Sequence, residues 1–364
     1  MKILLVGEYS NVHATLAEGL RALGHQVTVI SNGDFWKNYP RDIDVARHPG
    51  KIGGIRLIAK LYTLLPKMRG YDVVQLINPM FFELKAERLF FFYDYLRRHN
   101  KKVFLGGYGM DWYWVHTCTY DKPLRYSDFN FGSEVRTDAE AVRQQNDWLG
   151  TVKERLNKYI AQDCDGIITG LYEYWACYHP AFPEKTVNIP FPIRMPDHSS
   201  TERAQPSKVV IFLGINRERS VYKGTDIMLR AAEDVRDKYP HRMKLLVAES
   251  VPFAEYQQMM EGSDAILDQL YAYTPSMNPL LAMSKGIICI GGGEPENYEI
   301  INETELHPII NVEPTYESVC QALEDLVLHP ERIPELKRQS IEYVRKHHDY
   351  IKVARQYLDF WTQK

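Results

Sequence analysis

Short apolar runs alternate with segments of helical spacing along the first half of the chain. Residues 2–6 have the pattern of a buried strand, and Ser10 or Asn11 can cap a helix that runs to about residue 23. The same alternation predicts strands over 26–30, 72–77, 102–105 and 166–169, and helices over 55–68, 84–98 and 139–161. Residues 112–132 are irregular and aromatic, which is more typical of a functional loop than of an idle one.

The pattern stops near residues 188–192, and residues 199–207 are polar and irregular. A second series follows, with strands over 208–213, 243–247, 265–267 and 286–290 and helices over 224–238, 253–261, 278–283 and 316–328. The order of strands and helices predicts an α/β protein with two Rossmann-like, doubly wound parallel-sheet domains facing a cleft. We expect these domains over 1–193 and 194–345, and a helix over 346–364 that crosses back to the first domain.

The composition excludes some classes of protein. A hydrophobic share of 45% and a charged share of 25% are typical of a soluble globular protein, and a net charge of −3 gives no reason to expect nucleic acid. The five cysteines are scattered, as in proteins with reduced thiols. The first apolar run is too short for a signal core or a membrane span, so we expect a cytoplasmic protein.

A basic, glycine-containing loop follows the strand predicted over 208–213. Gly214 lets the backbone approach a ligand, and Lys223 and Gly224 open the next helix, where anions are favoured. Arg217, Arg219 and Lys223 have the charge to neutralise a diphosphate, and the alternative is a solvated basic loop. The spacing is not that of a Walker P-loop.

Two polar residues, Asp268 and Gln269, follow the strand predicted over 265–267. Residues at that end of a parallel strand lie where ligands bind in open α/β sheets. Hydrogen bonds to a ligand and capping of the strand end are equally good explanations of this pair.

Residues 280–299 combine a helix-like run, a strand-like run, the glycines 291–293 and several carboxylates. Taken in order with the loops above, they resemble the retaining GT-B glycosyltransferases, the large family-4-like group that uses nucleotide sugars. The matching elements are Lys-Gly at 223–224, Asp-Gln at 268–269, Ala-Met-Ser-Lys-Gly at 282–286 and Gly-Gly-Glu-Pro-Glu at 292–296. Residues 1–30 and the Ile-Pro-Phe-Pro near 190 agree more loosely with the family's opening and its crossover between domains.

The resemblance implies that the second domain holds the donor. Arg217 and Lys223 would stabilise the diphosphate leaving group in place of a metal. The donor contacts implied are Gly214, Arg219, Gly224, Asp268, Gln269, Ser276, Asn278, Gly292, Gly293 and Glu296. The chain departs from the family at two positions that usually carry glutamate, where it has Tyr273 and Leu281. The second of these normally helps to hold the ribose of the donor.

The loop after the strand over 102–105 ends in Asp111 and resembles an acceptor-side element of some relatives. A carboxylate there is placed to orient or deprotonate an acceptor hydroxyl, and the alternative is a turn aspartate that stabilises the loop. The acceptor contacts implied at this and neighbouring strand ends are Ser10, Asn11, His13, Asn78, Tyr108 and Trp112. For His13 a hydrogen bond at the helix start is the better explanation, and Trp112 has the alternative of anchoring the loop.

Basic amphipathic segments lie over 51–69 and 87–102. They predict either helices that cover the sheet or peripheral contact with the inner face of a membrane. Since no Asp-x-Asp follows a strand and no His/Cys cluster occurs, we expect neither a metal nor a cofactor. The sequence also lacks the glycine signature of nicotinamide enzymes and the serine elbow of hydrolases.

The sequence therefore predicts a metal-independent, retaining hexosyltransferase-like enzyme. It would move a sugar from a nucleotide-sugar donor to a glycan, lipid-linked or other hydroxyl acceptor, as in the synthesis of cell-envelope polysaccharide. Because both expected glutamates are absent, the alternative is a non-catalytic sugar- or nucleotide-binding protein of the same fold. An epimerase or a phosphorylase on this fold is a weaker alternative.

Overall fold

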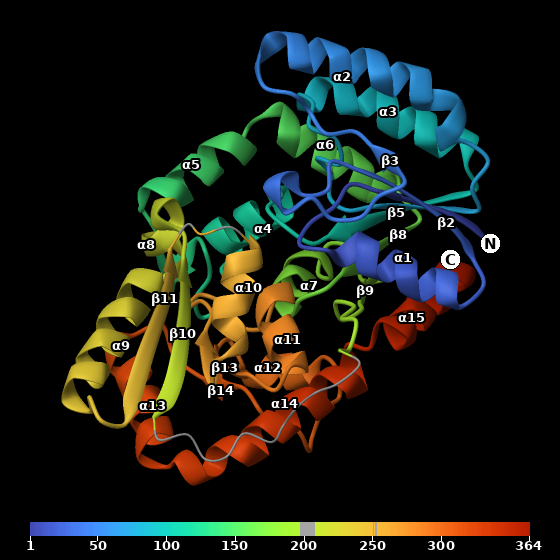
Figure 1. The fold of residues 1–364 in the computed structure, drawn as a ribbon. Helices are drawn as coiled ribbons and strands as arrows, with labels where there is room; N and C mark the ends of the chain where they lie inside the picture. The colour runs from blue at the N-terminus through green and yellow to red at the C-terminus, as the bar shows by residue number, and fades with distance from the viewer. Residues whose placement is uncertain (197–207, 250, 252) are drawn as a thin grey trace. The chain divides into compact units, whose positions relative to one another are not determined.

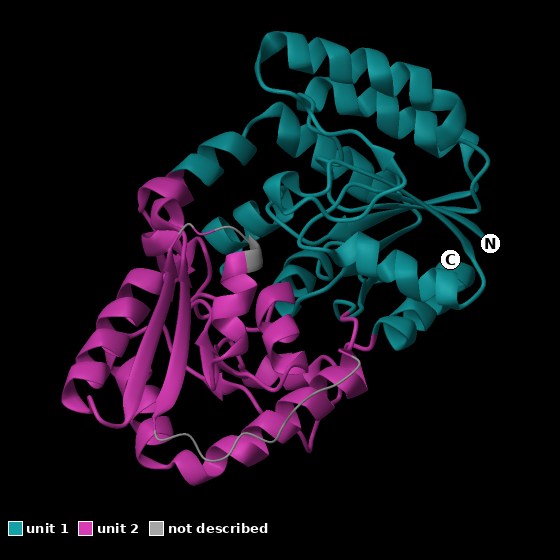
Figure 2. Ribbon diagram, viewed as in Figure 1, with its two compact units in different colours: residues 1–123, 143–192, 350–364 teal, residues 124–142, 193–349 magenta. Residues whose placement is uncertain are grey.

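The computed structural model describes residues 1–196, 208–249, 251 and 253–364. It divides into two compact units, each made of separate stretches of chain (Figures 1 and 2). Unit 1 comprises Met1–Pro123, Arg143–Pro192 and Tyr350–Lys364, and unit 2 comprises Leu124–Val142 and Ile193–Asp349. The first domain was expected to span 1–193 without interruption, whereas residues 124–142 group with the second compact unit. The polar stretch 199–207 lies outside the described residues.

Unit 1 is built on a parallel sheet of seven strands, in the order β3-β2-β1-β4-β5-β8-β9. The strands are β1 (Lys2–Val6), β2 (Gln26–Ser31), β3 (Ile43–Asp44), β4 (Val73–Leu76), β5 (Lys102–Gly107), β8 (Gly166–Thr169) and β9 (Thr186–Asn188). Ile3 of β1 pairs with Val27 of β2 on one side and with Val73 of β4 on the other. Every residue of β4 and β8 is buried, as expected for parallel strands covered on both faces.

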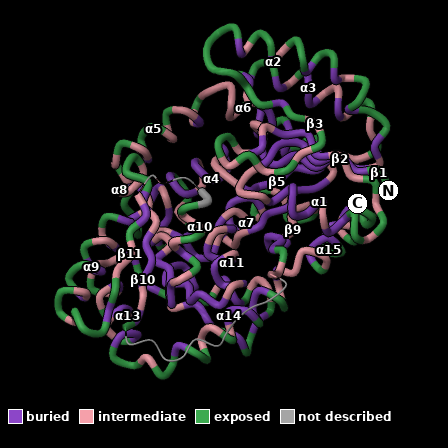
Figure 3. Tube along the Cα trace, viewed as in Figure 1, coloured by how far each residue is buried: buried purple, intermediate pink, exposed green. Residues whose placement is uncertain are grey.

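Helices cover both faces of this sheet. They are α1 (Val12–Ala22), α2 (Gly50–Leu64), α3 (Ala86–His99), α4 (Trp112–His116), α6 (Val152–Asp163), α7 (Tyr172–Tyr178) and α15 (Tyr350–Gln363), and α5 (Ala139–Trp148) enters the unit at Arg143. The C-terminal α15 packs closely on α1, because a Cβ built on Gly19 would lie 2.4 Å from the carbonyl oxygen of Tyr350. Figure 3 shows the buried strands and the exposed outer sides of α2 and α3.

Unit 2 has a parallel sheet of five strands, in the order β11-β10-β12-β13-β14, and a separate hairpin. The strands are β10 (Val209–Ile215), β11 (Met243–Glu249), β12 (Ala265–Leu267), β13 (Ile288–Gly291) and β14 (Ile310–Asn311), and the hairpin pairs β6 (Asn130–Phe131) with β7 (Glu134–Val135). The helices are α8 (Ser220–Lys223), α9 (Thr225–Lys238), α10 (Phe253–Glu261), α11 (Met277–Ser284), α12 (Pro295–Glu299), α13 (Tyr316–Leu328) and α14 (Ile333–His347).

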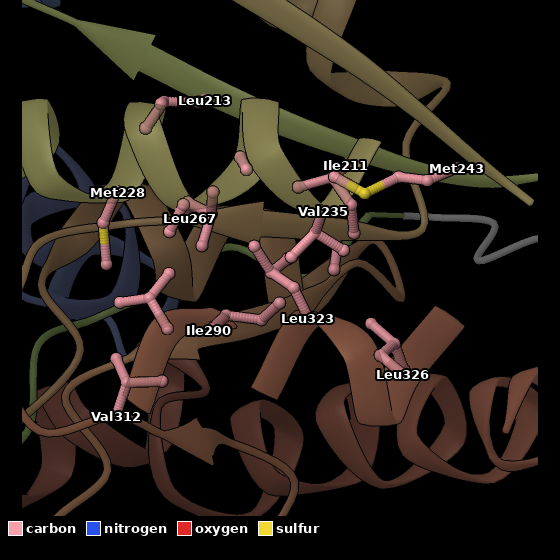
Figure 4. Packing of buried hydrophobic residues seen from close by; sticks show 14 of the residues in the cluster. Ile211, Leu213, Met228, Val235, Met243, Leu267, Ile290, Val312, Leu323 and Leu326 are labelled. Atoms are coloured by element: carbon pink, nitrogen blue, oxygen red, sulfur yellow. The ribbon is translucent and has the colours of Figure 1, made fainter. Parts of the chain in front are cut away.

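The core of unit 2 lies between this sheet and two of its helices. Leu213 of β10 and Leu267 of β12 pack with Met228 of α9 and Leu323 of α13, and all four are at most 1% exposed (Figure 4). This packing against α9 and α13 fixes the sheet. The loops that leave the carboxyl ends of its strands therefore begin at well-fixed positions.

The structure confirms most predicted strands and corrects two segments. Residues 112–132, expected to be irregular, contain α4, a π-helical turn (Thr117–Asp121) and strand β6. The single helix expected over 139–161 is two helices, α5 and α6. It breaks because Gly150 has a φ of 70°, and because the side chain of Thr151 accepts a hydrogen bond from the Lys153 amide to begin α6. In the described part of the chain, no helix has the length and apolar character to cross a bilayer.

Candidate functional site

Three loops at the carboxyl edge of the unit 2 sheet hold most of the residues implied as donor contacts. They follow β10, β12 and β13, which are neighbours in the sheet. Lys223 and Gly224 meet the loop after β12, since the Lys223 carbonyl accepts a hydrogen bond from the Leu270 amide at 3.0 Å. Gly224 has a φ of 73°, and a Cβ there would lie 2.8 Å from that of Leu270. Only glycine fits, so the backbone itself holds Lys223 at the edge of the sheet.

Asp268 lies in the loop after β12, and one oxygen of its carboxyl group lacks a hydrogen-bond partner among the described residues. Its amide continues the sheet by donating to the Ile290 carbonyl at 3.1 Å. Its Oδ2 is buried and accepts no hydrogen bond from any described residue. Burial raises the pKa of Asp268 to about 6, and the positive charge of Lys223 opposes that rise. Because buried polar atoms are nearly always satisfied, this unpartnered carboxylate oxygen makes Asp268 a candidate contact for a ligand.

The start of α11 borders the same edge. The ring of Tyr256 lies against Gly214, where a Cβ would come within 2.5 Å of the ring, and its hydroxyl accepts a hydrogen bond from the Asn278 side chain at 2.8 Å. Ser276 occupies the N-cap of α11 without making a side-chain capping bond. Gln269 continues the loop from Asp268 and is half-buried.

The glycines of the loop after β13 are explained by close packing. A Cβ on Gly292 would lie 2.3 Å from the Ala272 carbonyl oxygen, and one on Gly293 would lie 2.6 Å from Ile309. The Gly293 amide donates to the Asn311 side chain at 3.0 Å. These glycines therefore press the loop against its neighbours, and two carboxylates, Glu294 and Glu296, follow them in the chain.

An unexpected segment contacts those carboxylates. Residues 124–136, which we call the 124–136 hairpin, come from the first half of the sequence and belong to unit 2. The side chain of Asn130 holds the turn by donating to the carbonyls of Leu124 at 2.9 Å and Gly132 at 3.0 Å. Arg136 anchors its far end, with its guanidinium 3.8 Å from the ring centre of Tyr271 and a hydrogen bond to the Val221 carbonyl at 3.1 Å.

Arg125 of the 124–136 hairpin binds two carboxylates of the loop after β13. Its guanidinium donates to Glu294 at 2.8 Å and to Glu296 at 2.5 Å. Its amide donates to the hydroxyl of Tyr273 at 2.7 Å, and Tyr126 donates to Glu294. Burial alone would raise the pKa of Glu296, but its hydrogen bond to Arg125 and other contacts outweigh this and lower it. Tyr273, found where the family usually has glutamate, thus helps to seat Arg125.

Arg217 and Arg219 make different contacts. Arg217 is highly exposed and forms an ion pair with Glu249 at the end of β11. The guanidinium of Arg219 lies 5.2 Å from the ring centre of Tyr222. Leu281, at the second glutamate position of the family, lies in α11. No group of three or more His, Cys, Asp or Glu suited to a metal occurs among the residues that the structure describes.

In unit 1 the residues implied as acceptor contacts hold the local structure. Asp111 is the N-cap of α4, accepts from the Trp114 amide at 2.9 Å and the Tyr178 hydroxyl at 2.7 Å, and is fully buried. Burial raises its pKa to about 7, and these hydrogen bonds oppose the rise. The hydroxyl of Tyr108 lies 2.5 Å from that of Tyr357 in α15. These contacts match the alternative of a turn aspartate that stabilises the loop.

The remaining acceptor candidates lie at the ends of β1 and β4 and in α4. His13 is buried with Nδ1 2.8 Å from the Gly7 carbonyl, and the Asn78 side chain donates to the Met110 carbonyl at 3.2 Å. The ring of Trp112 lies against that of His116 in a tilted arrangement, with ring centres 4.3 Å apart. Ser10 and Asn11 form a left-handed turn with φ of 52° and 73°.

Asn11 occupies the N-cap of α1, but a different side chain caps the helix. The carboxylate of Glu8 accepts from the His13 amide at 3.3 Å and the Ala14 amide at 2.8 Å. Sequence reasoning missed Glu8, Tyr256, Arg125 and Glu294. The aromatic character of residues 112–132 was the available signal for the 124–136 hairpin, but nothing local in it indicates that it joins the other unit.

The sequence matches no family profile and no curated protein, but solved structures share its fold. A sucrose-phosphate synthase from Thermosynechococcus elongatus has a TM-score of 0.64 and 14% identity, over 100% of this chain and 99% of that one. Anabaena Alr3699/HepE in complex with UDP and glucose has a TM-score of 0.59 and 13% identity, over 100% of both chains. UDP-GlcNAc 2-epimerase from Neisseria meningitidis, bound to UDP-GlcNAc, has a TM-score of 0.55 and 11% identity, also over 100% of both. The chain has the GT-B fold.

Proposed function

We propose that this protein is a nucleotide-sugar-dependent glycosyltransferase whose donor binds at the carboxyl edge of the unit 2 sheet. The observation that carries the proposal is the buried, unpartnered Oδ2 of Asp268 beside Lys223. A carboxylate accepts hydrogen bonds from sugar hydroxyls, and a lysine binds phosphate as a point charge. A nucleotide sugar carries both groups on one molecule, and the similar structures named above include complexes with UDP and UDP-GlcNAc.

In this proposal each loop has a separate task. Lys223 stabilises the negative charge that develops on the leaving diphosphate, in the place where other enzymes use a metal. Asp268 accepts a hydrogen bond from a donor hydroxyl, and the start of α11, with Ser276 and Asn278, offers amides to the phosphates. Glu296, held by Arg125, contacts the sugar. Residues of unit 1 bind the acceptor, and transfer proceeds with retention, as in the glycosyltransferases that the sequence resembles.

Two other functions are compatible with this fold. A UDP-GlcNAc 2-epimerase is among the similar structures, so epimerisation of a nucleotide sugar is the competing enzymatic activity. The second is a non-catalytic function. Tyr273 and Leu281 replace the two glutamates that the resemblance leads one to expect, which favours a protein that binds a sugar or a nucleotide without turning it over. Each of these functions uses the same donor site in a different way, and product analysis separates them.

A ligand panel tests the proposal directly. We expect UDP-, GDP- or ADP-sugars to raise the melting temperature, with one base preferred, and the best ligand to release its nucleotide when hydroxyl acceptors are present. Chromatography of the products distinguishes a transferred sugar from an epimerised one. Binding without turnover would favour the binding protein, and the absence of any stabilising nucleotide sugar would overturn the proposal.

The pKa of Asp268 gives a second prediction. Burial raises this pKa to about 6, so the side chain gains its charge as the pH rises from 5 to 7. An ionised carboxylate accepts hydroxyl hydrogen bonds more strongly, and the affinity for UDP-glucose should therefore increase over this range. The phosphates of UDP-glucose keep their charge there, and Asp268→Asn should flatten the curve. Calorimetry at several pH values measures this affinity. A decrease in affinity with rising pH would contradict the placement of Asp268 at the donor hydroxyl.

A further inference from the structure

A cavity of about 290 Å³ opens at the carboxyl edge of the unit 1 sheet. Residues that follow β1 and β4 line it, together with residues of α5 and the start of α6. The turn at Gly7 brings the backbone close to Ile77, because φ is 85° there and a Cβ would lie 2.2 Å from Ile77. Its volume is just below the range of pockets for drug-sized ligands and suits a single ring with its substituents.

Aromatic rings and thioethers form one part of the wall of this cavity. Phe81, Phe82 and Trp148 are at most 4% exposed, and Met80 and Met110 add flexible apolar surface. Flat aromatic faces suit a ligand that has an apolar face of its own. Amides and carboxyls lie among them, including Asn32, Gln144 and Glu8. A pyranose ring has this combination, with C–H groups on its faces and hydroxyls around its edge.

The charged groups at the cavity leave a small negative excess near neutral pH. The lining contains Glu83 and Asp147 against one cation, Lys153, and also Glu8, whose raised pKa leaves its carboxyl largely protonated at pH 7. Lys153 already pairs with Asp147, with Nζ 2.5 Å from Oδ2. The carboxylates around Tyr9, which include Glu83, also help to raise the pKa of its hydroxyl, after the larger effect of burial. A phosphate or carboxylate in this cavity would therefore meet like charge.

Glu8 is a buried polar side chain in the lining of the cavity, held in a fixed orientation. It is 2% exposed, and both of its oxygens are positioned by amides of α1, so its orientation is fixed. Each oxygen retains capacity for one more hydrogen bond. Burial raises the pKa of Glu8 to about 8, against the effect of these amides. Near neutral pH, a protonated Glu8 can donate a hydrogen bond to a ligand hydroxyl, and an ionised Glu8 can accept one from it.

We infer that this cavity is the acceptor subsite and that it takes an uncharged pyranoside, stacked on the aromatic wall with a hydroxyl directed at Glu8. The inference rests on the proposed glycosyl transfer and narrows its acceptor. An acceptor that would place a phosphate in this cavity is therefore excluded. In this inference the acceptor is recognised by the residues of the cavity, and not by Asp111 and Tyr108.

Binding without a donor tests the inference separately from transfer. Five neutral phenyl pyranosides (gluco, galacto, manno, rhamno and N-acetylglucosamino) are titrated into the full-length protein by calorimetry. The best of them is then compared with its 6-phosphate, or with its 4-phosphate for the rhamnoside. We expect at least one to bind and its phosphate to bind at least about tenfold more weakly, because of the carboxylates. Met80→Trp, which fills the cavity, should abolish binding.

Two variants serve as controls. Ile52→Trp introduces the same ring at a highly exposed position of α2 in the same unit and should leave binding unchanged. Glu83→Lys, at a half-exposed position, should reduce the discrimination against the phosphate. The inference is overturned if no neutral pyranoside binds, if the phosphate binds as well, or if Met80→Trp has no effect. If no nucleotide sugar of the panel binds while pyranoside binding is intact, the proposed function is contradicted instead.

Discussion

Replacing Lys223 by alanine is expected to lower the rate of sugar transfer by about 10²–10³-fold. In the proposed site its ammonium group faces the leaving diphosphate, and removing one such group from a transition-state site typically has an effect of this size. The fold should be retained, because it is the carbonyl of Lys223 that accepts the Leu270 amide, and alanine keeps that carbonyl. Nucleotide release under saturating donor measures the effect, with the melting temperature as a check on folding.

A matched lysine in the same unit provides the control. Lys285 forms an ion pair with the exposed Glu261 at 2.6 Å and lies at the end of α11, away from its N-terminus. Lys285→Ala should leave the rate within about twofold, as expected for a surface pair. Near-normal turnover in Lys223→Ala would remove the basis for placing the diphosphate there, and an equal loss in both variants would indicate a general effect on stability.

Replacing Arg125 by alanine is expected to weaken nucleotide-sugar binding by about tenfold and to lower the free energy of unfolding by about 1–2 kcal/mol. The variant leaves Glu294, whose side chain is 8% exposed, without its cation, and it frees Glu296 from its fixed orientation. The stability estimate is kept low because the Arg125 side chain is itself 55% exposed to water. Urea unfolding and donor titration measure the two effects.

Arg338 is a close control for Arg125. It also pairs with two carboxylates of unit 2, Glu335 and Glu342, and its side chain is 57% exposed, but both partners are exposed as well. Arg338→Ala should leave the free energy of unfolding and the donor affinity nearly unchanged. A double-mutant cycle with Glu296→Gln then isolates the pair. If Arg125→Ala behaves like Arg338→Ala, the 124–136 hairpin has no part in donor binding.

The strands were predictable from the sequence because a buried parallel strand is apolar along its whole length. The run that forms β1 and the one that forms β13 are examples, and both are fully recognisable without the structure. The break between α5 and α6 was missed, because Gly150 and Thr151 interrupt a pattern whose apolar spacing continues across them. Here a local backbone preference prevailed over periodicity.

The candidate site was predictable only where its residues follow strands. Lys223 and Asp268 lie at such positions, so their common edge of the sheet follows from the topology. Arg125 and Glu294 are 169 residues apart, and no local pattern connects them. Glu8 resembled an ordinary surface residue near a helix start, and its burial depends on packing across the sheet. Long-range partners of this kind require the fold itself.

The position of the 124–136 hairpin in the sequence has a consequence for the order of folding during synthesis. Four of its partners, Tyr271, Tyr273, Glu294 and Glu296, are made more than a hundred residues later. Most of unit 1 can fold as it emerges from the ribosome, while the hairpin must wait as an unpaired loop until residue 296 has been translated. During that interval its exposed phenylalanine and arginines are open to other proteins, and a fragment that begins after residue 193 would never acquire the hairpin at all.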